Sequence, residues 1–126
     1  RELRDNAGKY DVAVLDVHAE ATAEKLALAY GFDGRIGFVF GTHTHVQTSD
    51  ARVLPLGTAY VTDVGMTGRT DSVLGVDSGP VIEHMTTRMP VKFTVSDGPT
   101  EIDYVVAEID VKTGRATGVS AHRDFV

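Results

Sequence analysis

The stretch that decides the fold is DVAVLDVHAEATAEKLALAYGFDGRIGFVFGTHTH, residues 11–45. Residues 12–17 form a nearly continuous apolar run with valines, which is typical of a strand buried on both faces. A segment rich in Ala, Leu, Glu and Lys follows at residues 20–30 and predicts a helix. Residues 35–40 form a second short apolar run. Strand, helix and strand in this order predict a βαβ unit with a parallel sheet.

The helix in this unit has a predicted apolar face and a clear end. Leu26, Ala27 and Tyr30 fall on one face at helical spacing. Gly31 follows directly, and glycine commonly ends a helix. We therefore expect this face to pack on the sheet.

The later part of the chain predicts short strands, one long loop, a short helix and an antiparallel meander. Turn residues such as Asp97-Gly98 and Thr113-Gly114 separate the last apolar runs. Strands are expected at residues 53–54, 58–62, 91–95, 102–111 and 115–121, the loop at 63–77 and the helix at 80–88. With 126 residues, the chain is long enough for one modest core, so we expect one α/β domain.

Composition excludes several classes of function. Twelve basic and eighteen acidic side chains give a net charge of -6, which argues against duplex nucleic acid as a partner. The chain has no cysteine, so a disulfide framework and thiolate metal sites are excluded and any metal needs nitrogen or oxygen ligands. We find no membrane-length apolar run and no secretion signal, so we expect a cytoplasmic protein without a membrane partner.

The segment Gly41-Thr42-His43-Thr44-His45 carries the clearest chemical signal, because imidazole is a common metal ligand at neutral pH. On a regular strand His43 and His45 would face opposite sides, so we expect the chain to curl after residue 40, with Gly41 permitting the curl. Such a loop can give one histidine to each of two ions. His18 ends the preceding strand and should emerge at the same edge of the sheet.

Other polar residues near these motifs have simpler interpretations. His84 and His122 lack a comparable context and are expected to be surface or packing residues. Glu20 and Glu24 are expected to complement the N-terminus of the helix. For Asp63 and Thr67 a role in a turn is favoured over contact with a substrate.

Three motifs, DVHAEATAEK at residues 16–25, GTHTHVQT at 41–48 and TDVGMTG at 62–68, resemble successive motifs of one family. It is the bacterial 2',3'-cyclic-nucleotide 2'-phosphodiesterase branch of the calcineurin-like metallophosphoesterases. The resemblance runs over residues 10–111. It implies that the chain is part of an αββα sandwich, with a βαβ unit followed by mostly antiparallel strands.

The resemblance also implies a site and a reaction. Two divalent or trivalent metal ions are expected, with Fe or Mn favoured and Zn compatible. His18 and His43 would share one ion and His45 would bind the other. Thr42 and Thr67 are candidate substrate-binding residues. The reaction would be hydrolysis of a 2',3'-cyclic nucleotide, or of another phosphodiester, by water that the metals activate.

The family's other metal ligands are an Asp, a bridging carboxylate and an Asn, and none has a counterpart in this chain. The same holds for the histidine beside that Asn, which is the expected general acid. Residues 1–126 are therefore predicted to be the C-terminal portion of a metallophosphoesterase domain, with residues 1–9 as the end of a helix. Such a chain would need a partner that supplies the N-terminal half, and alone it would bind at most one ion.

Two other functions stay open at this point. One is a non-catalytic metal-binding or assembly module, in which exposed apolar surface pairs chains as a homo-oligomer. The other is a mononuclear enzyme in which His18, His43 and His45 hold one zinc with an open water position. No carboxylate is clearly placed beside the histidines in the sequence, which counts against this second alternative.

Overall fold

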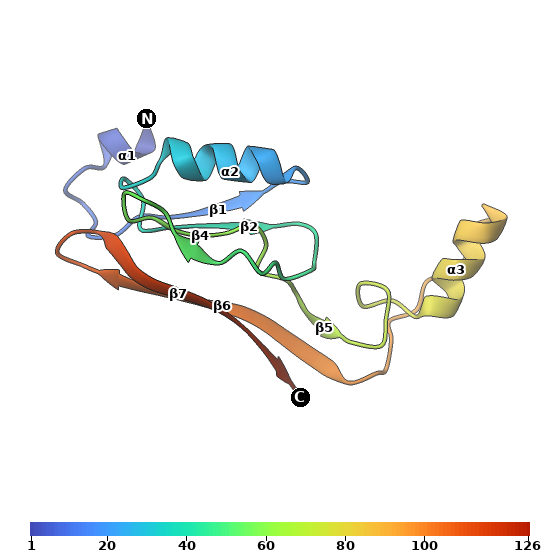
Figure 1. Ribbon diagram of the computed structural model, residues 1–126. Coiled ribbons are helices and arrows are strands. Elements are labelled where there is room, and N and C mark those ends of the chain that lie inside the picture. Colours follow the sequence, from blue (N-terminus) through green and yellow to red (C-terminus); the bar gives the residue numbers. More distant parts are fainter. The chain divides into compact units, whose positions relative to one another are not determined.

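A computed structural model describes residues 1–126 (Figure 1). The chain divides into two compact units. The first comprises Arg1–Gly65 and Tyr104–His122, and the second comprises Met66–Asp103 and Arg123–Val126.

The first unit contains the predicted βαβ unit. Its elements before residue 65 are α1 (Glu2–Asp5), β1 (Val14–His18), α2 (Thr22–Gly31), β2 (Phe38–Thr42), β3 (Arg52–Val53) and β4 (Ala59–Val61). The four strands form one sheet in the order β1-β2-β4-β3, in which β1, β2 and β4 are parallel and β3 is antiparallel. The α/β fold class is therefore confirmed.

The core of this unit lies between α2 and the sheet. Its buried members are Val17, Ala29, Ile36, Val39, Leu54 and Tyr60. Along β1 only Val17 is buried, whereas Val14, Asp16 and His18 are exposed. The prediction that this strand is covered on both faces is therefore wrong. In this chain β1 lies at the edge of the sheet, and its alternate side chains point away from the helix.

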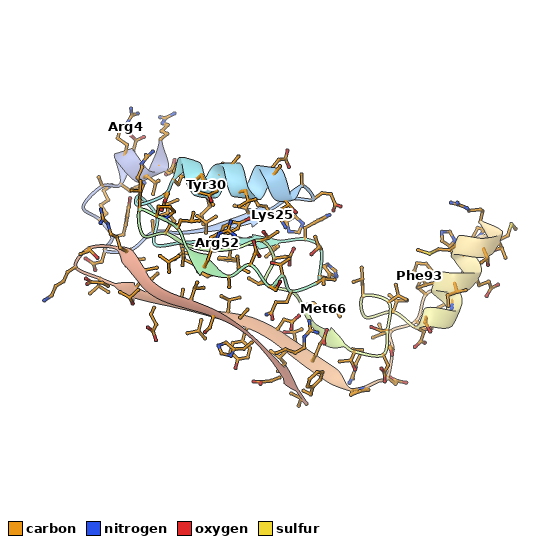
Figure 2. All side chains as sticks on the ribbon, viewed as in Figure 1. Arg4, Lys25, Tyr30, Arg52, Met66 and Phe93 are labelled. Carbon is orange, nitrogen blue, oxygen red and sulfur yellow. The ribbon has the colours of Figure 1, made fainter.

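Helix α2 turns a different face to the sheet from the one predicted. Lys25 and Ala29 are fully buried, Leu26 is partly buried, and Ala27 and Tyr30 are exposed. The cause is that Lys25 has an ion-pair partner inside the core, so a residue that reads as solvent-facing lies inside (Figure 2).

A hairpin formed by β6 (Thr100–Asp110) and β7 (Arg115–Phe125) runs through both units. Within the first unit it lies on the side of the sheet opposite α2 (Figure 1). The amide of Ala116 donates to the carbonyl of Gly57 over 2.7 Å. A Cβ on Gly37 would lie 3.1 Å from the Ile109 side chain, so the hairpin packs closely there.

The second unit contains β5 (Thr67–Arg69) and α3 (Ser78–Thr87). Strand β5 pairs antiparallel with β6, so residues 63–77 are not the uninterrupted loop that was predicted. Helix α3 begins two residues before Pro80, which is tolerated in the first turn because no helical N–H bond is needed there.

The strand predicted at residues 91–95 is not formed. Its only ladder contact is one isolated bridge from Val95 to Val76, because no extended partner runs alongside the segment. No helix in the chain combines the length and the apolar character needed to cross a membrane.

Candidate metal centre

The parallel register of β1 and β2 creates the candidate site. His18, the last residue of β1, pairs with Thr42, the last residue of β2. Both strands therefore end at one edge of the sheet, and His43 follows there directly. This is the edge at which open α/β sheets place their sites.

His18 and His43 are the two predicted ligands that the structure brings together. His18 Nε2 and His43 Nδ1 are 3.1 Å apart, and the rings meet edge to face with centroids 4.9 Å apart. Two nitrogens at this distance, each ~2.0–2.1 Å from one ion, would subtend roughly 100° at that ion. That angle lies between the octahedral and tetrahedral values, so the pair fits one shared metal.

A threonine and an aspartate hold the His18 ring. Thr42 Oγ1 donates to Asp16 Oδ1 over 2.9 Å, and it lies 3.0 Å from His18 Nδ1. Because the single hydroxyl proton goes to the carboxylate, Thr42 must accept from Nδ1–H of His18. This leaves the lone pair of His18 on Nε2, the nitrogen that faces His43.

A glutamate holds the His43 ring in the same way. Glu20 Oε2 lies 2.8 Å from His43 Nε2 and can only accept, so this nitrogen carries a proton, and in the neutral ring that binds a metal Nδ1 keeps the lone pair. Glu20 stands just before the N-cap of α2 and Glu24 lies in its first turn, which agrees with their predicted place at the helix N-terminus, but the carboxylate of Glu20 also contacts His43.

When both rings are neutral, the two lone pairs of His18 and His43 face each other across 3.1 Å. A cation between them stabilises this arrangement, and outer hydrogen bonds to carboxylates and hydroxyls are typical of metal-binding histidines. The pair therefore fits two ligand positions of a metal ion, and no third His, Asp or Glu side chain is arranged to join them.

The loop that carries His43 and His45 is strained at the histidines themselves. Their φ angles are +118° and +64°, a region that side chains other than glycine rarely adopt. The prediction that Gly41 permits the curl is wrong, because Gly41 lies within β2. It is needed for close packing, since a Cβ there would lie 1.7 Å from the carbonyl oxygen of Thr62.

The carboxylate of Asp63 holds this loop through hydrogen bonds. One carboxylate oxygen accepts from the Thr44 amide at 2.9 Å and from Lys25 Nζ at 3.1 Å, and the other accepts from the Gly65 amide at 3.0 Å. Burial raises the pKa of Asp63, but the hydrogen bonds from the Thr44 and Gly65 amides outweigh burial and hold the pKa below its ordinary value. The turn role predicted for Asp63 is present, but it is only part of what the side chain does.

A second aspartate fixes the chain beyond the loop. Asp50 accepts from the hydroxyls of Thr48 and Thr62, each over 2.6 Å. Burial raises the pKa of Asp50, but these two hydrogen bonds and one from the Thr62 amide outweigh it, so the pKa is lowered.

The remaining candidates are His45, His84, His122 and Thr67. His45 is exposed, and no group of three His, Asp or Glu side chains is arranged to hold one ion. His84 contacts the carbonyl of Met89, and His122 stacks on Tyr104. Thr67 belongs to the second unit, so its substrate-binding role stays a prediction.

Comparison with known proteins supplies the family. The family model described as YmdB-like protein matches residues 1–121. The chain belongs to this family. The YmdB-like chain is 54% identical over 105 residues to a 2',3'-cyclic-nucleotide 2'-phosphodiesterase of Bacillus subtilis, covering 83% of the chain and 40% of that relative. A putative phosphatase/phosphodiesterase of Mycoplasma pneumoniae is 40% identical over 114 residues, covering 90% of the chain and 41% of that relative.

Two solved structures share the fold of the YmdB-like chain. A hypothetical protein from Thermus thermophilus superposes with a TM-score of 0.84 at 40% identity, covering 91% of the chain and 45% of that protein. A phosphatase from Mycoplasma pneumoniae gives 0.85 at 39% identity, covering 91% and 41%. The family resemblance predicted from the three motifs is confirmed. The chain spans less than half the length of each of these relatives.

Sequence reasoning missed the residues that hold the two histidine rings and their loop. Asp16, Glu20 and Lys25 all lie in the DVHAEATAEK motif, but only its histidine was chosen. The available signal was the density of charged residues at and just after the end of the first predicted strand, at the edge where the site lies.

Proposed function

We propose that this chain supplies the C-terminal half of a metal-dependent phosphodiesterase that hydrolyses 2',3'-cyclic nucleotides. The observation that carries the proposal is the 3.1 Å approach of His18 Nε2 to His43 Nδ1, with the other nitrogen of each ring already engaged. The substrate class is supported by the name of the Bacillus subtilis relative.

In this proposal the three histidines serve two ions. His18 and His43 hold one ion through Nε2 and Nδ1, and His45 serves the second. When bound, two ions would activate water and neutralise the charge that develops on the phosphodiester. Fe or Mn is favoured and Zn is compatible with the nitrogen ligands.

The residues of this chain hold and orient the site. Thr42 and Asp16 keep the proton of His18 on Nδ1, and Glu20 keeps the proton of His43 on Nε2. Each interaction leaves the inward nitrogen free to bind a cation. Thr42 therefore acts on His18, and its contact with substrate stays a prediction.

The remaining ligands and the general acid would come from a partner that carries the N-terminal half. Three neutral imidazoles bring no negative charge, so a second cation close to the first would meet strong repulsion without further carboxylates. We therefore propose that this chain alone binds at most one ion and is inactive.

The test is hydrolysis of 2',3'-cyclic AMP with added Mn²⁺, by this chain alone and after mixing with the remaining part of the Bacillus subtilis relative. The expected result is turnover only in the mixture, and only with metal. His18→Ala in the mixture should abolish it, whereas His84→Ala, on α3, should not. Strong turnover by the chain alone would instead support the mononuclear enzyme.

The competing proposal is an assembly module. The observation that favours it is the exposure of Ile82, Met85 and Met89 on and just after α3, at 58%, 67% and 62%. Calorimetric titration with Mn²⁺ separates the two proposals, because a pure assembly module binds no ion at His18 and His43.

A further inference from the structure

A fully buried ion pair lies beneath the histidine loop. Lys25 Nζ on α2 is 3.1 Å from Asp63 Oδ2, and both side chains have 0% exposure. Figure 2 shows Lys25 between the helix and the sheet. No buried polar side-chain atom in the chain lacks a hydrogen-bond partner, those of this pair included.

The Asp63 carboxylate fixes the peptide between the two histidines of the loop. The oxygen that contacts Lys25 also accepts the amide of Thr44 over 2.9 Å. The backbone of Asp63 exchanges hydrogen bonds with Thr48, and the amide of Val64 donates to the carbonyl of Gly41. The loop is therefore tied before, between and after its histidines.

Filling the core does not explain this pair. An apolar pair of similar volume often stabilises a core as well as, or better than, a buried ion pair. The contacts of Asp63 instead go to a loop in which His43 and His45 both have positive φ. Such conformations persist where the surroundings determine them, and they gather at functional sites.

We infer that Lys25 and Asp63 are positioning residues that set the histidine loop for metal binding. Asp63 holds the Thr44 peptide so that His43 faces His18. Lys25 holds the Asp63 carboxylate in place through the contact of Nζ with Oδ2. This inference rests on the proposed function, because it assumes that His18 and His43 bind an ion.

The experiment compares Asp63→Asn and Lys25→Met with Asp33→Asn in the 126-residue chain. Asp33 is a matched control, because it is also a buried aspartate that accepts two backbone amides, those of Leu56 and Thr58, at 2.9 and 3.1 Å. It contacts no part of the histidine loop. Zn²⁺ is titrated by calorimetry and by ¹⁵N NMR of the rings of His18 and His43. Amide exchange at Thr44 and thermal unfolding are measured in parallel.

We expect Asp63→Asn and Lys25→Met to weaken Zn²⁺ binding by about 10–100-fold, the usual loss when an outer partner of a metal ligand is removed. The Thr44 amide should exchange faster in both, while the ladder amides of β2 stay protected. Asp33→Asn should lower the unfolding temperature and leave Zn²⁺ affinity unchanged.

Each other outcome overturns the inference in a distinguishable way. Unchanged Zn²⁺ affinity in both variants, with a faster Thr44 amide, refutes positioning and leaves the metal site standing. Equal loss of affinity in Asp33→Asn assigns the effect to global stability. Absence of Zn²⁺ binding by the unaltered chain refutes the proposed function together with the inference. If neither variant folds, amide exchange in the unaltered chain decides. The inference is refuted if the Thr44 amide exchanges there as fast as an amide in an open loop.

Discussion

Gly41→Ala tests the close packing of β2 against Thr62, next to the histidine loop. An added Cβ would lie 1.7 Å from the carbonyl oxygen of Thr62 and 2.7 Å from Cδ of Lys25. The first atom is backbone in a neighbouring strand region and cannot rotate away, so β2 must move away from the chain after β4. Overpacking usually costs 1–3 kcal/mol, and a clash with backbone belongs at the upper end, about 3 kcal/mol.

For a chain of this size, a loss of about 3 kcal/mol lowers the unfolding temperature by roughly 10–15 °C. The assay is thermal unfolding followed by circular dichroism, with urea unfolding as a second measure. Gly31→Ala is the matched control, because a Cβ there meets no atom within 4 Å and its φ is not positive. Alanine favours the helix, so this variant should unfold at the same temperature or slightly higher.

The result that would refute the reasoning is equal unfolding of Gly41→Ala and the unaltered chain. That result would show that the backbone around Thr62 can move to accept a methyl group at little cost. A loss of the same size in Gly31→Ala would be equally damaging, because it would show that any added methyl group disturbs the chain.

Three further predictions concern the loop and its surroundings. In a complete two-metal enzyme, His43→Ala and His45→Ala should remove metal from different positions in anomalous scattering maps, and loss at one shared position would favour the mononuclear site. Thr42→Val should weaken Zn²⁺ binding about 10-fold, measured by calorimetry, because His18 loses the acceptor that fixes its tautomer; unchanged affinity would contradict this. The pKa of Asp50 is lowered from 3.8 in the folded chain, so its contribution to stability is present above that value and is lost as the pH falls through the folded pKa. Asp50→Asn should therefore be less stable by about 1–2 kcal/mol at pH 7, and urea unfolding should show the difference shrinking below pH 4; a constant difference would exclude this origin.

The βαβ unit could be predicted because its signals are local. Each apolar run, at residues 12–17 and 35–40, predicts its own strand, and the composition between them predicts the helix. The order of the three elements is that of a βαβ unit. The observed elements Val14–His18, Thr22–Gly31 and Phe38–Thr42 differ only at their ends. The meeting of His18 and His43 followed from the same logic, because parallel strands end at one edge.

The failures arose where a residue depends on a distant partner. Strand β5 exists because it pairs with β6, more than thirty residues later, and nothing within residues 63–77 indicates this. The segment at residues 91–95 has the composition of a strand but lacks a partner of matching length. Periodicity describes what a segment can bury, whereas pairing decides whether a strand forms.

The buried face of α2 could not be predicted for a related reason. Lysine is almost never fully buried unless it is paired, so a pattern rule assigns Lys25 to solvent and turns the helix toward Leu26, Ala27 and Tyr30. The partner that reverses this assignment, Asp63, lies 38 residues further on. The burial of both charges follows only when two contacts are considered together, the ion pair of Lys25 on α2 with Asp63 and the hydrogen bond of Asp63 to the histidine loop.

Such a conflict between local pattern and fold is expected where function imposes its own requirement. The buried lysine, the packing-restricted glycine and the two positive-φ histidines all surround one short loop. Stability alone would favour an apolar helix face and a relaxed turn at this place. Because all these departures from local preference support the same two histidines, the placement of His43 and His45 is the simplest common cause.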